Sequence, residues 1–305
     1  MRDVSKCLFV DLNTESAETL SLGGEENGFP RSGWGFLPPL FLCLLEKGRP
    51  FVSVSAGKVT GTGAPGSAGM TWCGASGGVF AAAAAEGRFG AYLRHSGFEH
   101  LCVTGKAAKK AALLIRDGEV SVVPLRKRRE EDFLRELRSF TADGERVIVT
   151  EADGVLSEDG DFPLGDAFFA GLFREKNLSA VVVSGHGGIP VADPERFLRL
   201  CAEFRGDCPA GETTARPARY LSPGGERSLG AGRLLSFADS REELEKTALS
   251  LLGLAWENYD FIDDKLRKAL ALYNAVTGAN CRETELTESA RKAARQGREL
   301  LGKGR

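Results

Sequence analysis

Apolar and polar residues alternate with a period of two in several short segments of the first half of the chain. Residues 7–12 (CLFVDL), 18–22 (ETLSL), 51–55 (FVSVS) and 147–150 (VIVT) show this alternation or a short apolar run, and 70–73 (MTWC) is interpreted in the same way. Successive side chains of a strand point to opposite faces, so these segments predict strands with one or both faces buried.

One continuous stretch combines such signals in a fixed order. A short amphipathic helix is predicted to end at Gly97, and a buried strand follows at 101–103. Two more strands, 111–115 and 120–123, flank Asp117-Gly118. Asp-Gly between apolar runs favours a tight hairpin, because a type I′ turn needs the positive φ that glycine accepts at little cost.

Helical patterns lie between and after these strands. Pro38 and Pro39 can start a helix within the apolar residues 36–46, because the first N–H groups of a helix have no partner inside it. Apolar residues at helical spacing predict an amphipathic helix over 126–140. Residues 162–183 are predicted to form a helix followed by a buried β-branched strand.

The last third of the chain is predicted to be helical. Asp193 is expected to cap a helix that has proline at its first position. Residues 206–233, rich in Gly, Pro, Arg and Ser, are interpreted as a loop or mobile linker. Ser240 and Glu243 have the spacing of a capping box at the start of the helical residues 240–302.

Composition excludes several classes of protein. The chain has 305 residues, 42% of them hydrophobic and 27% charged, with a net charge of −2. This balance gives no electrostatic reason to expect nucleic acid or an anionic membrane as partner. The basic run at 126–129 is followed at once by acidic residues, so a solvated helix face is expected there. No apolar run is long enough to span a membrane, and the chain begins in a strand, so export is not expected.

Seven cysteines are scattered along the chain, and none of them forms a CxxC pair. Several lie in apolar contexts, where a free cysteine behaves as a small hydrophobic residue. A reduced, cytoplasmic protein is the interpretation that this usage favours.

Residues 87–107 (GRFGAYLRHSGFEHLCVTGKA), with the LLIRDGEV hairpin that follows, resemble the N-terminal domain of the aldehyde ferredoxin oxidoreductase family. These are tungstopterin and iron–sulfur enzymes with the signature GGxFGxxLKxAGYDxLxxxGKA at this place. The opening hairpin and residues 176–183 (KNLSAVVV) continue the resemblance, which covers 5–188. Residues 271–278 (ALYNAVTG) are similar to a late stretch of the full-length enzymes, which are about twice as long.

The resemblance implies an α/β (α+β) fold with a mixed β-sheet N-terminal domain over 1–190. A helix and Gly/Pro-rich linker would follow over 191–239, and a helical remnant of the C-terminal domains over 240–305. Residues 76–86 (SGGVFAAAAAE) are ambiguous, because five consecutive alanines favour a helix whereas the family has a strand and turn there.

In the family, the tungsten centre is held by pterins, and a [4Fe–4S] cluster by a CxxCxxxC motif and a later DxxGLC cysteine. The only candidate for the first motif is Cys208, with Arg205 and Glu212 nearby in place of further thiolates, whereas a cluster needs four. In the second motif the Gly-Leu core remains, but Ser250 replaces the Asp and Ala255 replaces the Cys. We therefore expect no tungsten or cluster, and no metal ligands or catalytic residues are assigned.

The Gly-rich loop after residue 56 is similar to the family's GPLTGTxxPxSGR loop. Thr60, Gly61, Thr62 and Ser67 match it and are candidate residues of a vestigial pterin cleft. A backbone cradle for a phosphate-bearing cofactor is one interpretation. A plain turn-rich connection is the other, because no Walker or Rossmann spacing is present.

The three histidines have no metal-ligand spacing. His95 and His100 are expected to be surface or capping residues, and His186 to lie in a turn.

These observations favour a degenerate, non-catalytic partner or scaffold subunit, paired with itself or with a full-length paralogue. The missing helical domains are expected to leave a large apolar face exposed, and such surfaces usually mark interfaces. Two alternatives stay open. One is an active tungstopterin subunit that takes its cluster from another chain, and the other is a small-molecule binding module that uses the old pterin cleft.

Overall fold

The computed structural model describes residues 5–22, 33–126, 135–137, 139, 146–150, 155–157, 163–164, 167–207, 233–255 and 264–303. Within these ranges no helix combines the length and the apolar character needed to cross a membrane. Of the helix predicted over 126–140, residues 135–137 and 139 are described and are helical. Residues 208–232 of the predicted linker lie outside the described residues, as does Cys208.

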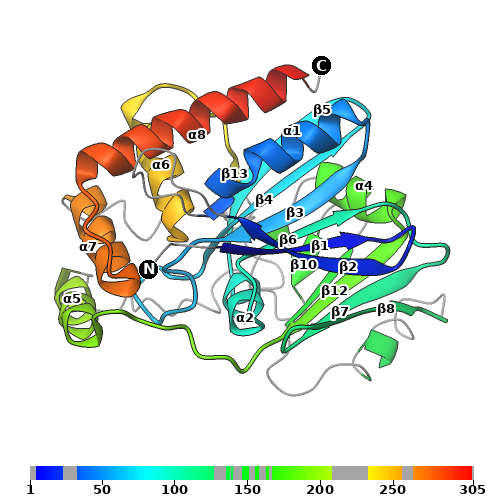
Figure 1. Cartoon of the computed structure of the whole chain (residues 1–305), viewed down its shortest axis with the longest axis horizontal. Coiled ribbons are helices and arrows are strands. Elements are labelled where there is room, and N and C mark those ends of the chain that lie inside the picture. Colours follow the sequence, from blue (N-terminus) through cyan, green and yellow to red (C-terminus); the bar gives the residue numbers. More distant parts are fainter. Residues whose placement is uncertain are drawn as a thin grey trace, which may run out of the picture.

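The strands form two sheets (Figure 1). The first has the order β13-β5-β4-β3-β6-β1-β2 and the second the order β11-β10-β9-β12-β7-β8. The first sheet contains β1 (Ser5–Asp11), β2 (Ser16–Leu22), β3 (Phe51–Ala56), β4 (Gly69–Ser76), β5 (Val79–Glu86), β6 (His100–Thr104) and β13 (Arg233–Leu234). The second contains β7 (Ala111–Arg116), β8 (Glu119–Pro124), β9 (Arg146–Thr150), β10 (Val155–Ser157), β11 (Pro163–Leu164) and β12 (Leu178–Ser184).

Both sheets are mixed, which confirms the predicted fold class. The pairs β1–β6 and β7–β12 are parallel, and the other pairs are antiparallel. The sequence suggested one mixed sheet, whereas the structure has two. The predicted strand–hairpin unit crosses between them, because β6 belongs to the first sheet and the β7–β8 hairpin to the second. Its turn has the expected positive φ values, 45° at Asp117 and 90° at Gly118.

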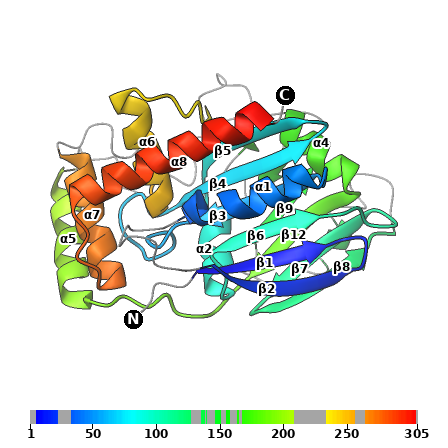
Figure 2. The same ribbon diagram turned by 45° about the horizontal axis from the view of Figure 1, so that its top comes forward.

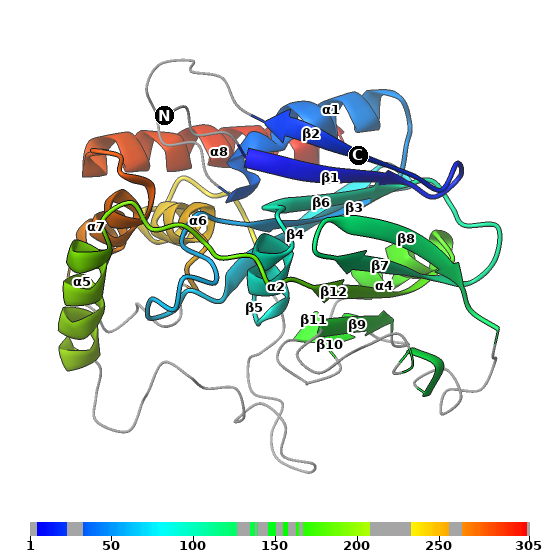
Figure 3. The same ribbon diagram turned by 60° about the horizontal axis from the view of Figure 1, so that its bottom comes forward.

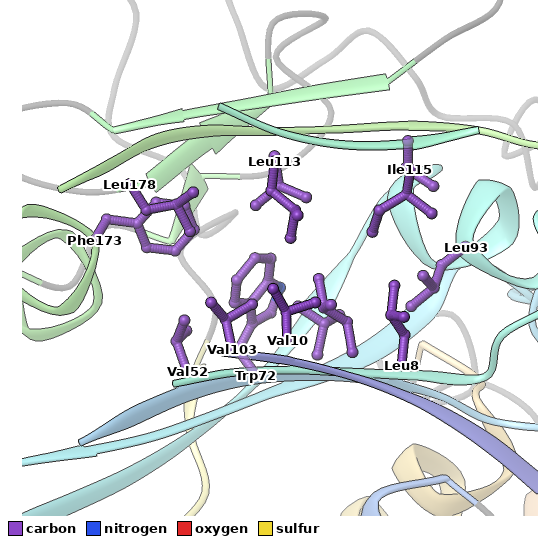
Figure 4. Close-up of a cluster of buried hydrophobic side chains, with 14 of the residues drawn as sticks. Leu8, Val10, Val52, Trp72, Leu93, Val103, Leu113, Ile115, Phe173 and Leu178 are labelled. Carbon is purple, nitrogen blue, oxygen red and sulfur yellow. The ribbon is translucent and has the colours of Figure 1, made fainter. Parts of the chain in front are cut away.

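An apolar layer joins the two sheets (Figure 4). From the first sheet, buried side chains of β1, β3, β4 and β6 point toward β7, β12 and α4 (Ala167–Glu175). Trp72 is the largest residue of this layer, and its ring lies 6.2 Å from that of Phe173 and 6.4 Å from that of Phe169. Apolar burial stabilises a fold by about 1.5–3 kcal/mol per large side chain, so this layer is a principal source of stability.

Helices cover the outer face of the first sheet (Figure 2). They are the 3-10 helix η1 (Gly33–Phe36), α1 (Pro38–Glu46) and α8 (Glu283–Lys303), and they share a core with Phe51, Phe80 and Cys102 of the sheet. Phe41 of α1 stacks on Phe51 with ring centroids 4.6 Å apart. Within the described residues, Val79 and Leu198 are the exposed large hydrophobic residues, at 52% and 66%. The expected large apolar face is therefore wrong for this part of the chain, because its own helices cover the sheet.

Three further helices form a cluster beside the sheets (Figure 3). They are α5 (Pro194–Asp207), α6 (Arg241–Leu252) and α7 (Lys265–Thr277), and α5 packs on α7 through Phe197, Cys201 and Phe204. Asp193 caps α5 as predicted, since its Oδ1 accepts from Arg196 N. Ser240 caps α6 by accepting from Glu243 N. The domain limits proposed from the sequence stay a prediction.

Residues 79–86 form a strand, so the helical interpretation of the alanine run is wrong. All eight residues of β5 pair with β4 through a hairpin whose turn has φ of 58° at Gly77 and 80° at Gly78. Ala82 and Ala83 are both buried, on opposite faces of the sheet. Burial and a complete ladder outweigh the small propensity difference of an alanine.

His100 is fully buried in β6, which contradicts its expected surface position. Its Nδ1 lies 2.7 Å from Ser55 Oγ on the neighbouring strand. Burial, together with the charges of Lys58 and Arg94, lowers the pKa of His100 to about 3. The strand pattern of residues 101–103 extends to include this histidine, so the residue is part of the ladder and not of a surface turn.

Lys176 joins the two sheets at the start of β12. Its side chain is buried, and Nζ donates to Pro50 O at 2.8 Å, with Gly105 O at 3.4 Å. These two carbonyls flank β3 and β6 of the first sheet. The next residue, Asn177, donates from Nδ2 to Ala107 O at 2.7 Å. Burial lowers the pKa of Lys176 to about 8.

We predict that Lys176→Ala destabilises the protein by about 2–4 kcal/mol, because it leaves a cavity and removes the charged donor from two carbonyl groups. Lys106→Ala is the control, since that lysine is exposed and its loss should change stability by less than about 0.5 kcal/mol. Urea denaturation of both variants at neutral pH measures the difference. Equal stability of the two variants would contradict this role of Lys176.

A second prediction concerns pH. The folded state keeps His100 neutral down to about pH 3, whereas the unfolded chain binds a proton below about pH 6.5. Stability is therefore fully present above pH 6.5 and falls by about 1.4 kcal/mol per unit as pH decreases toward 3. His100→Asn should remove this contribution, so denaturant titrations from about pH 7 to 4 should give a shallower slope for the variant. Parallel pH dependence of the two proteins would refute the assignment.

Candidate functional site

The Gly-rich loop between β3 and β4 and the C-terminal end of α6 form one unit. α6 ends in a Schellman motif, in which Gly253 has φ of 83°, Gly253 N donates to Ser250 O and Leu254 N donates to Leu249 O. Leu254 and Leu249 are buried in the same core, as this motif favours. The retained Gly-Leu pair of the sequence is thus explained as a helix cap.

The loop holds this helix end directly. Val59 N donates to Leu252 O at 3.0 Å, and Ala255 N donates to Gly66 O at 2.8 Å. A helix leaves its last carbonyl groups without partners, and the loop supplies one of the missing donors.

Glycine allows the backbones to approach this closely. A Cβ added at Gly57 would overlap the backbone of Leu252 and Gly253, and one added at Gly69 would lie 2.6 Å from Leu254 C. A Cβ at Gly253 would overlap the hydroxyl of Thr60. These glycines are therefore required by contacts between loop and helix, which is one of the uses of a residue without a side chain.

The structure brings the four predicted site residues together in this unit. Thr60 is fully buried, and its hydroxyl accepts from Gly57 N while its hydrogen lies within reach of Gly69 O at 2.9 Å and Gly253 O at 3.2 Å. Gly61 N donates to Ser67 O. Thr62 Oγ1 donates to Val59 O. The assignment of these residues to a vestigial pterin cleft stays a prediction.

Most N–H groups of the loop are already paired within the protein. A phosphate cradle needs several N–H groups that point to the ligand. Seven N–H groups of this loop donate to loop or α6 oxygens, namely those of Gly57, Val59, Thr60, Gly61, Thr62, Ala64 and Ser67. The geometry thus uses the donors that such a cradle would offer.

The cations near the loop are also engaged. Lys58 Nζ lies 3.2 Å from Glu99 Oε1, and both side chains are largely buried. Arg94 NH1 of α2 (Phe89–His95) donates to the carbonyl oxygens of Lys58 and Thr60. Sequence reasoning missed Arg94, whose position in the GRFGAYLR motif was the available signal. These charges hold the loop in place from the side of α2.

The two residues that replace the family's functional positions are parts of the internal packing. Ser250 is buried, accepts from Trp34 Nε1 at 3.4 Å and donates to Thr247 O at 2.8 Å. Ala255 is buried beside Gly66. Ala255 has no atom that could bind iron, and the hydroxyl of Ser250 is engaged with Trp34 and Thr247.

The described cysteines do not converge on a metal site. Cys7, Cys73 and Cys102 are buried in the first sheet, and burial raises the pKa of Cys102 to about 12, so its thiol stays protonated. Cys201 lies in α5 and Cys281 between α7 and α8. Throughout the described ranges, no three His, Cys, Asp or Glu residues are placed to hold a metal ion. The described residues therefore do not supply the four converging thiolates that a [4Fe–4S] cluster needs.

The other two histidines lie together near the end of β12. His95 Nδ1 lies 2.6 Å from Gly187 O, so this nitrogen carries the proton and donates it. His186 pairs with Asp117 in the β7–β8 turn, with 3.0 Å between Nδ1 and Oδ2, and both residues are exposed. His95 thus holds the segment after β12 against α2, whereas His186 is exposed and lies in the irregular segment after β12 and not in the predicted turn.

Comparison with known proteins adds family information to this geometry. Residues 44–147 match the family profile described as "Aldehyde ferredoxin oxidoreductase, N-terminal domain". The chain is 26% identical over 167 residues to the tungsten-containing aldehyde ferredoxin oxidoreductase of Pyrococcus furiosus, a match that covers 49% of this chain and 27% of that enzyme.

A solved structure shares the fold. It is a chain of the active site complex BamBC of benzoyl coenzyme A reductase in complex with 1,5-dienoyl-CoA, with a TM-score of 0.57 and 18% sequence identity. The match covers 66% of this chain and 34% of that chain, so our chain spans only a quarter to a third of either relative. Residues 44–147 are thus similar to the N-terminal domain of the aldehyde ferredoxin oxidoreductase family, and the solved structure agrees with this likeness in fold.

Proposed function

We propose that this chain is a non-catalytic member of the family, which acts as a partner or scaffold subunit without a tungstopterin or [4Fe–4S] cluster of its own. The observation that supports this most directly is the packing of Ser250 and Ala255 at the end of α6. A family enzyme would need a carboxylate and a thiolate at these two positions. Here both positions are filled by small side chains within the core.

A partner role is supported by the solved structural neighbour, which is part of a complex named for two components. The described cysteines are free, which supports a reducing compartment such as the cytoplasm.

The metal content of the purified protein tests the proposal. We expect tungsten, molybdenum and iron far below one atom per chain when the protein is produced anaerobically in a host that makes the tungstopterin cofactor. Inductively coupled plasma mass spectrometry on the protein after size-exclusion chromatography measures this. Stoichiometric tungsten or molybdenum would overturn the proposal and favour an active subunit.

A variant separates iron binding from the rest of the cofactor machinery. Ala255→Cys restores the thiol of the second motif. The position is buried, so the added sulfur atom is tolerated poorly, although it introduces no charge. Because the described residues supply no further converging thiolates, we expect no visible absorption from iron–sulfur charge transfer and no gain of iron over the wild type. Iron uptake at four atoms per chain by the variant alone would show that three other ligands are in place.

The partner role predicts a stable complex with a full-length family member of the same organism. Coexpression with only the full-length protein tagged should give a complex with both chains in equal amounts by light scattering. The tagged protein expressed alone is the control, and its metal content should not depend on our chain. Separate elution of the two proteins, with our chain monomeric, would argue against a partner subunit.

A further inference from the structure

The loop between β3 and β4 has the glycines of a ligand cradle, but its geometry points to a different role. We propose that the loop of residues 57–67 is the seat of this chain's own α6 end and takes no phosphate-bearing ligand. This inference rests on the proposed function for the absence of the cofactor. It deepens that proposal, because it says that the end of α6 occupies the space beside the loop glycines.

The first argument is the space beside the glycines. Gly57 and Gly69, at the two ends of the loop, are in contact with the backbone of residues 252–255 and not with an open surface. Gly61 is in contact with Ala91 of α2 and with Ile189. Gly63, by contrast, would meet nothing within 4 Å if it carried a Cβ. Gly63 is favoured by its positive φ of 81°, whereas Gly57 and Gly69 are required by their contact with the end of α6.

The second argument is the use of hydrogen-bond donors. The N–H group of Val59 is committed to Leu252 O, and that of Gly57 to the hydroxyl of Thr60. Binding an anion through these groups would break buried hydrogen bonds, each of which costs free energy when it is left unmade. A phosphate would therefore have to displace the end of α6 before it could reach the backbone of the loop.

The third argument is the central position of Thr60. Its buried hydroxyl is the one side-chain group of the loop that reaches both ends of the loop and the carbonyl of Gly253. Thr62, two residues later, bonds within the loop only, to Val59 O and Ala64 N. The two threonines share a motif in the sequence, and the structure separates them into one that seats α6 and one that shapes the turn.

Hydrogen exchange of the full-length protein tests the inference. Amides of Gly57, Val59, Thr60 and Gly61 should exchange slowly in the wild type, because they are paired in the folded protein. Millimolar inorganic pyrophosphate should leave their exchange and the melting temperature unchanged. Added protection of these amides by pyrophosphate, or exchange at the rate of an open loop without it, would overturn the inference.

Thr60→Val and Thr62→Val form a matched pair. Thr60→Val should speed exchange at Gly57, Val59 and Ala255 by about tenfold or more, the factor that corresponds to about 1.4 kcal/mol for one buried hydrogen bond. Thr62→Val should change exchange only at Thr62, Ala64 and their neighbours in the loop. If the two variants affect Ala255 equally, the loop does not seat α6 through Thr60.

The outcomes distinguish this inference from the proposed function. Pyrophosphate binding to a metal-free protein would contradict the inference that the loop takes no phosphate-bearing ligand, but it would leave the proposed non-catalytic role in place. Tungsten in the purified protein with unchanged, slow loop amides would overturn the non-catalytic role and leave the seat in place. If Thr60→Val does not fold, Thr60→Ser is measured in its place. This variant keeps the hydroxyl, so its amides should exchange at the rates of the wild type, and faster exchange at Ala255 would contradict the inference.

Discussion

The apolar layer between the two sheets is the constraint on which the rest of the structure depends. The strands β1, β3, β4, β5 and β6 of the first sheet each have one face in this layer, and helices cover the opposite face of the sheet. The strands β7 and β12 meet the same requirement from the opposite side, with Leu113 and Leu178 toward Trp72. Lys176 lies at the edge of the layer and connects the two sheets through hydrogen bonds. Its buried ammonium group is a donor to two carbonyl groups, and buried carbonyl groups need such donors.

The helical part of the chain is integrated into this arrangement and is not a loosely tethered remnant. α8 covers β5 on the outer face, and the end of α6 is interlocked with the loop between β3 and β4. Family resemblance alone suggested a leftover of lost domains. The packing shows that these helices complete the core of the described part of the chain, which accounts for the lack of a large apolar face there.

Local features of this fold were predictable, and the arrangement of distant parts was not. The Asp117-Gly118 turn, the Asp193 cap and the Ser240 cap depend on chemistry within a few residues, and each is found as predicted. The assignment of neighbouring strands to two sheets depends on pairing between residues far apart, which periodicity does not encode. The surface position predicted for His100 was wrong for a related reason, because its burial depends on the pairing of β6 with β3, where Ser55 lies beside it. At the candidate site, the sequence identified Thr60 and the loss of the Asp and Cys ligands, but contact between Gly57 and Gly253 follows only from the tertiary structure.

The pairing of β13 with β5 has a consequence for the synthesis of the protein on the ribosome. About 150 residues separate the two strands, and α8, which covers the same region, is made later still. Ribosomes add roughly 5–20 residues per second, so the part of the outer face that α8 covers stays uncovered on the order of ten seconds, whereas α1 is made before the strands that it covers. Synthesis of this chain therefore passes through a state in which part of the sheet is uncovered, and exposed apolar surface of this kind promotes aggregation.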